Sequence, residues 1–434
     1  MSEAGFARTS APLSARNGTV SEPRPRAFEA LRLPGFPVFV TTFMLTMMAD
    51  NIEHVMSYWV VFQKFRSPAL AGFAVISHWL PYLLFSVPVG ALNDRLDSRR
   101  LIQLGAVLFM AVSLGWGFLF LTDSLEVWHA MLLLVTHGCA GVFWITSSQV
   151  LLYDIVGPAS LPSAVRLNAT ARYLGVLVGP GVGSLVMRTI GPTYGILLNA
   201  SFYLPLIVWL VRAPYGRAAR AGLAGSSSVT ERPRRAVTGL EDIIETAREV
   251  RHMPLVLAMV VLAGAASFFV GNSYQAQMPG FAADLGHADP GAAYTVLLAA
   301  DAAGALLAGV LLETRRSGAP TRGRAALVLA ILWAVSLGAF GLTRTYPLAV
   351  VLLFAAGFFE LSFSSTAQTI VQIHAPNASR GRVLGLFNMA SAGLRTFSGV
   401  TVGLVGSFAT VHTSLALSAA AFAIVAGVLF LRAT

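Results

Sequence analysis

Three ionisable residues lie close together inside the first long apolar segment of the chain: Asp50, Glu53 and His54. Their spacings of three and four residues place them on one face of a helix. An ionisable group in the middle of a bilayer costs on the order of a few kcal/mol, so it normally faces a cavity or a partner. This helix face is therefore a candidate for proton or substrate binding.

Further ionisable residues interrupt apolar segments elsewhere, namely His137, Arg172, Asp301, Glu360 and Arg395. Among the acids, Asp50, Glu53 and Glu360 are candidates for binding and releasing a proton. The alternative is a buried ion pair that only holds helices together, for example Glu360 with Arg395. Because guanidinium groups bind carboxylates and phosphates in a fork geometry, Arg172 and Arg395 also suggest an anionic or zwitterionic substrate, such as a carboxylate siderophore.

The segments that carry these residues are long and strongly apolar. Apolar residues make up 56% of the 434 positions and charged residues only 12%, whereas soluble proteins have about 25% charged residues. Runs of roughly 20 apolar residues can cross about 30 Å of hydrocarbon. Such runs occur near 37–62, 68–92, 101–121, 126–156, 162–190, 192–211, 254–272, 290–312, 324–342, 347–374, 382–405 and 414–431. They are continuously apolar, which favours helices over a barrel. We expect an all-α membrane protein with twelve transmembrane helices in two pseudo-symmetric six-helix bundles.

The net charge of +10 follows the predicted topology. Basic residues are concentrated in the N-terminal tail, in the middle loop and in every second short loop. The loops of the opposite parity offer only Lys64, Arg66, Arg188 and Arg344. By the positive-inside rule, both termini and the middle loop are cytoplasmic. We therefore expect a multi-pass protein of the bacterial inner (plasma) membrane, and the charge does not indicate a nucleic-acid partner.

Composition divides the chain into four parts. Residues 1–35 are expected to be a disordered cytoplasmic tail, 36–212 the first bundle, 213–253 a cytoplasmic linker and 254–434 the second bundle. Within the linker, apolar positions 240, 243, 244, 247 and 250 keep helical spacing. This pattern predicts a short amphipathic helix on the membrane face, with a solvent-exposed linker helix as the alternative.

Short matches at a common offset indicate that the two halves are related. The run Gly90 to Arg100 has a weaker copy that begins at Gly309, 219 residues later. Gln149 and Gln368 are also 219 residues apart, and Arg166 and Arg382 are 216 apart. A shared offset favours duplication over chance.

The repeated run predicts a conformational latch in each half. Asp94 can accept hydrogen bonds from the N-terminus of a neighbouring helix, while Arg95 and Arg99 can pair with acids such as Asp154. The residues that we assign to the two latches are Gly90, Asp94, Arg95, Arg99 and Asp154 in the first half and Gly309, Glu313 and Arg315 in the second. The alternative is that Arg99 and Arg100 only fix the topology.

A glycine-rich motif lies in the fifth apolar segment and contains Gly175, Gly179, Pro180 and Gly183. Glycines four residues apart form a smooth stripe that lets helices approach closely. Pro180 removes a backbone hydrogen bond and bends the helix. By itself, this motif can also be no more than a packing face.

The twelve segments, the division into six and six, and the loop motif resemble the major facilitator superfamily over about residues 28–434. The first loop motif of that family reads roughly Gly-x-Leu-Ala-Asp-Arg-x-Gly-Arg-Lys, which Gly90, Leu92, Asp94, Arg95 and Arg99 match. Asp97 and Ser98 depart from it, and the variant is similar to the drug and siderophore exporter branch, which includes macrolide and enterobactin exporters. The glycine motif resembles the antiporter pattern of the same family, which implies efflux. The resemblance also places Asp50, Glu53, His54, His137 and Glu360 on helices that line a central cavity.

We therefore expect a secondary transporter that exports a small organic solute, drug or siderophore-like, in exchange for protons by alternating access. We predict that Asp50, Glu53 or Glu360 carries the coupling proton. A proton-coupled importer on the same fold is the closest alternative. A membrane-embedded receptor or scaffold without transport is a further one. No catalytic triad, metal cluster or phosphate-binding loop stands out, so we expect no enzyme activity, no cofactor and no metal. The expected partners are the solute, protons and the lipid bilayer, with the protein as a monomer.

Overall fold

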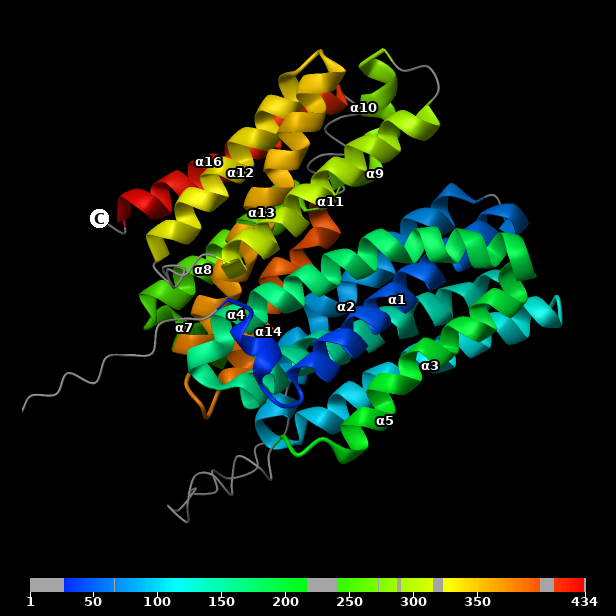
Figure 1. Ribbon diagram of the computed structural model, residues 1–434, viewed down its shortest axis with the longest axis horizontal. Helices are drawn as coiled ribbons and strands as arrows, with labels where there is room; N and C mark the ends of the chain where they lie inside the picture. Colours follow the sequence, from blue (N-terminus) through cyan, green and yellow to red (C-terminus); the bar gives the residue numbers. More distant parts are fainter. Residues whose placement is uncertain are drawn as a thin grey trace, which may run out of the picture.

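The fold is described from a computed structural model, which covers residues 27–65, 67–216, 240–271, 273–286, 290–314, 323–398 and 410–432. Within these ranges the chain is helical and contains no strand. Figure 1 shows the helices running roughly side by side in two groups, one from each half of the sequence. We call α1 to α5 the N-terminal bundle and α7 to α16 the C-terminal bundle.

The N-terminal bundle is built from three long helices, a very long kinked helix and short 3₁₀ or α segments. Its elements are η1 (Glu29–Arg32), α1 (Phe36–Phe65), α2 (Pro68–Arg95), α3 (Ser98–Leu121), α4 (Val127–Asn199), η2 (Ala200–Tyr203) and α5 (Leu204–Arg212).

Helix α4 is a chain of three helical stretches. Straight, its 73 residues would span about 110 Å, more than three times the bilayer core. Gly157 and Gly191 break it with positive φ values of 68° and 81°, which glycine adopts without steric cost. Each is followed by a proline, Pro158 or Pro192, which suits the first position of the next helical stretch. The breaks fall close to the boundaries predicted between apolar segments.

The C-terminal bundle contains more short elements. They are α7 (Leu240–Arg251), α8 (Pro254–Ala265), the π-helical η3 (Ala266–Val270), α9 (Ser273–Ala276), α10 (Met278–Asp284), α11 (Pro290–Thr314), α12 (Gly323–Leu342), α13 (Tyr346–His374), α14 (Arg380–Ser391), η4 (Gly393–Phe397) and α16 (Val411–Arg432).

Seven helices in the described part of the chain are long and apolar enough to cross a membrane. Helix α1 is not among them, since Asp50, Glu53 and His54 lower its hydropathy. The segment predicted at 254–272 forms only a shorter apolar helix, Pro254–Val270. The segment predicted at 382–405 changes from α14 to a 3₁₀ helix at Gly393, and its end lies outside the described residues. The number of twelve spans stays a prediction.

Separate aromatic-rich cores hold the bundles together. Phe39, Phe43, Phe109, Trp144 and Tyr203 are buried in the N-terminal bundle. The C-terminal bundle has an equivalent core, which includes Trp333, Phe340, Phe363 and Phe422. Large apolar side chains on the outside are exposed instead, among them Phe118, Leu185, Leu342 and Ile424. An outer surface of this kind fits a lipid environment.

Helix α7 lies where the sequence predicted a helix in the linker, but its buried face differs from the predicted one. Asp242, Thr246 and Val250 are buried, while Leu240 and Ile244 are exposed. The predicted apolar stripe is thus turned partly outward. Most of the predicted linker and tail, residues 217–239 and 1–26, lies outside the described residues.

The bundles meet closely where α2 crosses α14. A Cβ atom on Gly90 would collide with the Gly381 carbonyl oxygen, and one on Gly385 would collide with the Ser86 carbonyl oxygen. A Cβ atom on Gly393 would lie 2.6 Å from the Leu83 Cα. Glycine at these positions therefore allows backbone-to-backbone packing between the two bundles.

Candidate transport site

A buried histidine connects the two acids that the sequence places on α1. His137 Nδ1 lies 2.7 Å from Glu53 Oε1, and His137 Nε2 lies 2.8 Å from Asp50 Oδ1. His137 comes from the first stretch of α4, and Glu53 and His137 are only 2% and 4% exposed. The structure therefore brings together three of the residues that the sequence singled out.

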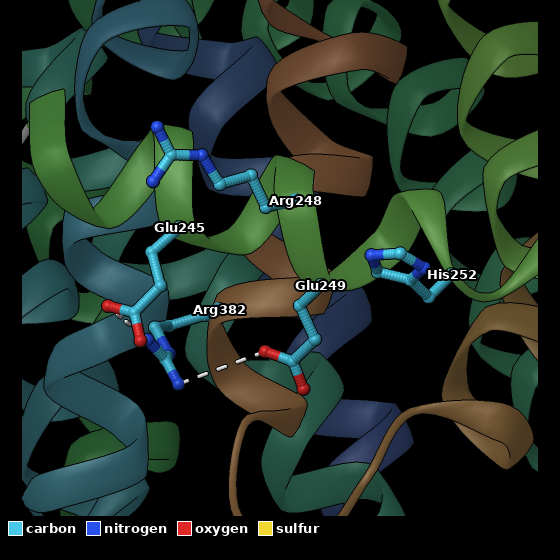
Figure 2. Close-up of a pocket in the computed structure, with 5 residues that line it drawn as sticks. All are labelled: Glu245, Arg248, Glu249, His252 and Arg382. Carbon is cyan, nitrogen blue, oxygen red and sulfur yellow. Dashed lines mark ion pairs between the residues drawn. The ribbon is translucent and has the colours of Figure 1, made fainter.

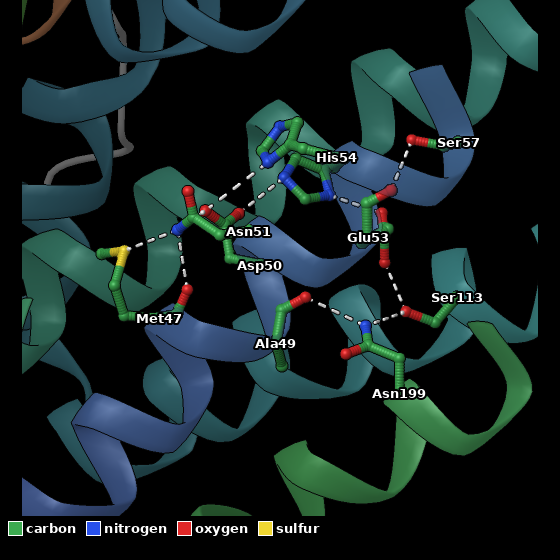
Figure 3. Close-up of polar contacts among 10 residues, drawn as sticks. Met47, Ala49, Asp50, Asn51, Glu53, His54, Ser57, Ser113 and Asn199 are labelled. Carbon is green, nitrogen blue, oxygen red and sulfur yellow. Dashed lines mark hydrogen bonds and ion pairs between the residues drawn. The ribbon is translucent and has the colours of Figure 1, made fainter. Parts of the chain in front are cut away.

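Neighbouring polar groups hold this cluster in place (Figure 3). The Ser113 hydroxyl from α3 donates to Glu53 Oε2. Asn199, at the end of α4, donates to the Ala49 carbonyl at 3.0 Å and to Ser113 Oγ at 3.3 Å. Ser113 and Asn199 were not predicted as site residues, although both interrupt apolar segments as the predicted residues do.

The hydrogen bonds fix the total charge of the cluster. Both ring nitrogens of His137 face carboxylate oxygens, so two protons must lie between the three groups. Either His137 is an imidazolium between two carboxylates, or His137 is neutral and one of the acids is protonated. Asp50, Glu53 and His137 carry a net charge of −1 in both cases. The cluster can thus relocate a proton without changing its overall charge.

Two more histidines adjoin His137. The His54 ring centroid is 4.7 Å from that of His137 and 5.0 Å from that of His78. His54 Nδ1 lies 3.7 Å from Asp50 Oδ2. His78, on α2, was missed in the sequence, where it is a single polar residue in an apolar segment, the same signal that identified His137.

The C-terminal bundle has its own buried acid. Asp301, on α11, accepts hydrogen bonds from Gln275 Nε2 at 3.1 Å and from the Tyr274 hydroxyl at 3.3 Å. The α11 backbone at Asp301 packs directly on Gly357 of α13. Glu360 follows Gly357 by one turn, so its carboxyl group interacts electrostatically with that of Asp301. Tyr274 and Gln275 were not predicted from the sequence.

The two partly buried arginines lie over aromatic rings. Arg395 stacks over Trp79 at 5.0 Å, and Arg172 lies over Tyr173 at 4.9 Å. Arg395 and Glu360 interact electrostatically. Within the described chain, however, no guanidinium nitrogen of Arg395 lies within 4.0 Å of a carboxylate oxygen of Glu360. The ion pair that the sequence left open as the alternative is therefore not formed within the described residues. Arg395 Nε is buried and has no hydrogen-bond partner.

Asp94 caps a helix of the opposite bundle. The backbone amides of Gly381 and Arg382 donate to its carboxylate at 2.6 and 3.1 Å. The N-cap of α14 itself, Ser379, gives no side-chain cap to its helix. This geometry is the one expected from the sequence for Asp94 at a helix N-terminus.

The second half contains a matching contact. Glu313, near the end of α11, accepts from Arg166 Nε at 2.6 Å and from Ser163 Oγ at 2.7 Å. Gly309, one turn earlier, packs against Thr170 on the same stretch of α4. Glu313 lies 219 residues after Asp94, and Arg166 corresponds to Arg382 in the repeat. The two halves thus exchange equivalent contacts.

The remaining predicted latch residues have other roles or lie elsewhere. Arg99 pairs with Asp97 at 2.7 Å and donates to the Ala213 carbonyl at 2.5 Å, both in its own bundle. The pairing of Arg95 or Arg99 with Asp154 stays a prediction. Arg315 lies outside the described residues.

Helix α7 joins the first latch through Arg382 (Figure 2). The Arg382 guanidinium lies 3.3 Å from Glu245 and 3.9 Å from Glu249. Together with Arg248 and His252, these residues line a small surface pocket. Ser379 Oγ donates to Glu249 at 2.5 Å. The linker helix therefore reinforces the start of α14.

Deeper in the molecule, two amide side chains join the bundles. Gln149 of α4 and Asn388 of α14 exchange hydrogen bonds at 3.0 and 3.1 Å. Asn388 also donates to the Thr146 hydroxyl at 3.3 Å. Both ends of each amide are used, so this contact is specific to the conformation seen here.

The glycine motif packs the second stretch of α4 onto α1. Cβ atoms on Gly175 and Gly179 would lie 3.0 and 2.9 Å from the carbonyl oxygens of Met44 and Met48. Gly183 faces Ile52, whereas Gly181 has nothing within 4 Å. The motif glycines, and not their neighbour, form the contact stripe. Because Asn51 and Met47 adjoin this stripe, the motif positions the helix that carries Asp50 and Glu53.

Comparison with known proteins identifies the class of this chain. Residues 38–399 match the model of the Major Facilitator Superfamily. The chain therefore belongs to this superfamily of membrane transporters, whose members are carriers and not enzymes.

Individual relatives agree with this assignment. The chain is 25% identical over 381 residues to the multidrug efflux pump Tap of Mycolicibacterium fortuitum, covering 86% of this chain and 90% of that protein. Its fold is similar to that of a proton:xylose symporter, XylE (TM-score 0.70, 18% identity, 91% of this chain and 94% of that one). It is also similar to the human organic anion transporter MFSD10 (TM-score 0.65, 14% identity, 91% and 100%).

Proposed function

We propose that this chain exports a small organic solute, a drug or a siderophore-like molecule, in exchange for protons by alternating access. Membership of the superfamily makes it a small-molecule transporter. Export is supported by the relative that is a multidrug efflux pump and by the antiporter-like motif around Gly179 and Pro180. We place it as a monomer in the bacterial inner membrane with both termini in the cytoplasm.

The observation that carries the proton coupling is the electrostatic interaction between the buried Asp301 and the partly buried Glu360. Two like charges close together in a buried site repel strongly, and a proton bound between them removes this repulsion. Arg395 provides positive charge near Glu360, and Arg172 lies near Arg395. An anionic or zwitterionic solute that binds these arginines alters the field at the acids, which couples solute binding to proton binding.

Alternating access is supported by the latch contacts. Asp94 and Glu313 each hold the opposite bundle, so both contacts must break before the bundles separate at that end. The conformation described here is closed at the latches. With the topology proposed above, it is a state closed to the cytoplasm.

The test begins with a growth-protection screen in a host that lacks its own drug pumps, which identifies a solute. Uptake of that solute into inverted membrane vesicles, driven by an imposed proton gradient, then reports the direction of transport. We expect uptake into inverted vesicles, which corresponds to export from the cell. Gradient-driven loss of the solute from inverted vesicles indicates the importer. If no solute from the screen moves across the vesicle membrane, the protein is a receptor or scaffold.

The coupling residues are tested in the same vesicles. Asp301→Asn and Glu360→Gln should each abolish gradient-driven uptake while solute exchange without a gradient continues. Asp50→Asn and Glu53→Gln test the other predicted acids. Asp123→Asn is the matched control, because Asp123 is exposed and the Lys64 ammonium holds its pKa below the usual value. Normal gradient-driven transport in all four variants would falsify the coupling assignment.

A further inference from the structure

We propose that the N-terminal bundle binds a divalent transition-metal ion, such as Zn²⁺, through His54, His78 and His137, with Asp50 as the fourth ligand. The inference does not depend on the direction or the coupling of transport. It concerns one part of the cluster on α1, α2 and α4, and it was not expected from the sequence.

The three histidines are already close enough to share an ion. One ligand nitrogen from each lies within 4.8 Å of the others. A tetrahedral Zn²⁺ with bonds of about 2.0–2.1 Å to imidazole nitrogens sets those nitrogens about 3.4 Å apart. The rings must therefore move together by roughly 1.4 Å at most, which side-chain torsions can supply without a change of backbone.

The chemistry of the donors selects the class of ion. Three imidazoles and one carboxylate suit zinc, copper, nickel and iron, whereas calcium and magnesium prefer sites made of oxygen ligands. Asp50 is in position to complete the set, since its carboxylate lies 2.8 Å from His137 and 3.7 Å from His54.

The surroundings of His137 are those of a supported metal ligand. A histidine that binds a metal normally donates its other ring N–H to a carboxylate. Glu53 accepts from His137 Nδ1 at 2.7 Å, and Ser113 and Asn199 hold Glu53 in turn. His137 Nε2 is thereby directed toward Asp50 and the other histidines.

The site also contains an unsatisfied ligand atom. His78 Nδ1 is buried and has no hydrogen-bond partner. A buried polar atom without a partner is unfavourable, and a bound ion would satisfy it. His54 is 20% exposed at its side chain, so an ion can enter from the side of His54 and His78 while His137 remains enclosed.

The charges balance when an ion replaces a proton. The proton that lies between His137 Nε2 and Asp50 must leave before both groups can bind a metal. The nitrogen lone pair then forms the bond to the ion, the proton leaves to the solvent, and Asp50 turns from His137 to the ion. A dication is balanced by Asp50 and Glu53 together. The Arg395 guanidinium, whose charge interacts with His78, opposes the ion, so we expect moderate affinity.

The experiment uses the full-length protein, without a histidine tag, in lipid nanodiscs. Calorimetry with Zn²⁺ measures the Kd, and the visible spectrum with Co²⁺ reports the coordination geometry. We expect one ion per chain and the intense spectrum of tetrahedral Co²⁺. His54→Ala and His78→Gln should each raise the Kd for Zn²⁺ at least about tenfold and remove the tetrahedral spectrum.

His252→Ala is the matched control, because His252 is exposed and lies far along the chain next to α8. Thermal melts without metal establish that each variant is folded, and Zn²⁺ should raise the melting temperature of the wild type but not of the variants. If the wild type binds Zn²⁺ no more tightly than the double variant His54→Ala with His78→Gln, or if bound Co²⁺ is octahedral, the site is overturned. Because binding is measured without transport, this result is independent of the export proposal.

Discussion

Asp94 shows how one side chain can join the two halves of a transporter. Its carboxylate takes the place of the missing side-chain cap of α14, a helix of the other bundle. The capping group and the helix can separate as rigid parts, unlike a cap within one helix. A single residue can therefore stabilise one conformation of the whole protein without contributing to the other.

We predict that Asp94→Ala shifts the protein away from the conformation closed at this end. The change leaves two backbone donors of α14 without their acceptor, which costs about 1–3 kcal/mol for each buried group. A loss of about 2 kcal/mol corresponds to a roughly 30-fold change in the equilibrium. Distances between spin labels on α2 and α14, measured in a Cys139→Ser background, report the shift.

The control for this experiment is Asp97→Ala. Asp97 caps α3 and pairs with Arg99, both within its own bundle. The Asp97→Ala substitution removes a carboxylate only three residues from Asp94, but it should leave the distances between the spin labels unchanged. Equal distances in the Asp94 and Asp97 variants would show that Asp94 does not bias the conformation.

Single residues were predicted best where both chemistry and spacing appear along one helix. Asp50 and Glu53 lie one turn apart, and a single ring reaches both. Partners from distant segments, such as His78 and Ser113, could not be placed because nothing in their local sequence says which helix they face. The Glu360 and Arg395 pair failed for the same reason: complementary charge does not establish contact.

At the scale of elements, the glycine motif decides how α4 meets α1. Gly175, Gly179 and Gly183 share one face of the second stretch of α4, and each lies close to atoms of α1. The face that carries Asp50 and Glu53 depends on this fit. The glycine stripe therefore packs α4 on α1 and also positions the acids of α1. A role in packing does not exclude a role in function.

We predict that Gly179→Ala destabilises the protein and impairs transport, while Gly181→Ala does neither. A Cβ atom at Gly179 would lie 2.7 Å from the Asn51 Cβ and 2.9 Å from the Met48 carbonyl oxygen. Overpacking of this kind typically costs about 1–3 kcal/mol. At Gly181 there is nothing within 4 Å, and alanine is the better helix former by about 1 kcal/mol.

Thermal unfolding midpoints in detergent and solute uptake in vesicles measure the two effects. The comparison is matched, since both substitutions add one methyl group to the same helical stretch, two residues apart. Should both variants melt at the wild-type temperature and transport normally, α1 does not require the glycine stripe.

The elements themselves were largely predictable from apolar segments, but their ends and faces were less so. The breaks at Gly157 and Gly191 fall close to the bounds of the predicted apolar segments 126–156, 162–190 and 192–211. The change from α14 to η4 was not predicted. In α7, the buried face contains Asp242 and Thr246. The helix packs against α14, α2 and α8, and the spacing of apolar residues alone does not show which face makes these contacts.

At the scale of the molecule, the repeat gives a simple account of conformational control. Asp94 extends from the N-terminal bundle to α14, and Glu313 extends from the C-terminal bundle to α4. The Glu313 contact adjoins η1, because Ser163 donates to Glu313 and accepts from the Ala30 amide. The Asp94 contact adjoins α7, because Arg382 pairs with Glu245. The two contacts are equivalent when the halves are exchanged, and we expect both to oppose separation of the bundles at this end.

We predict that the two latches contribute additively to closure. Asp94→Ala and Glu313→Ala alter separate contacts with no shared partner, so their free energies should add within about 0.5 kcal/mol. If each removes about 2 kcal/mol, the double variant changes the equilibrium roughly 1,000-fold and populates mainly the open state.

Hydrogen–deuterium exchange in lipid nanodiscs measures this shift. Exchange at the starts of α14 and of the second stretch of α4 should rise modestly in each single variant and strongly in the double variant. The double variant Asp97→Ala with Asp123→Asn removes two acids that stay within the N-terminal bundle and should exchange like the wild type at both sites. If removal of either latch alone already gives the full increase, the two contacts form one cooperative unit, and the independent symmetric latches inferred from the repeat are wrong.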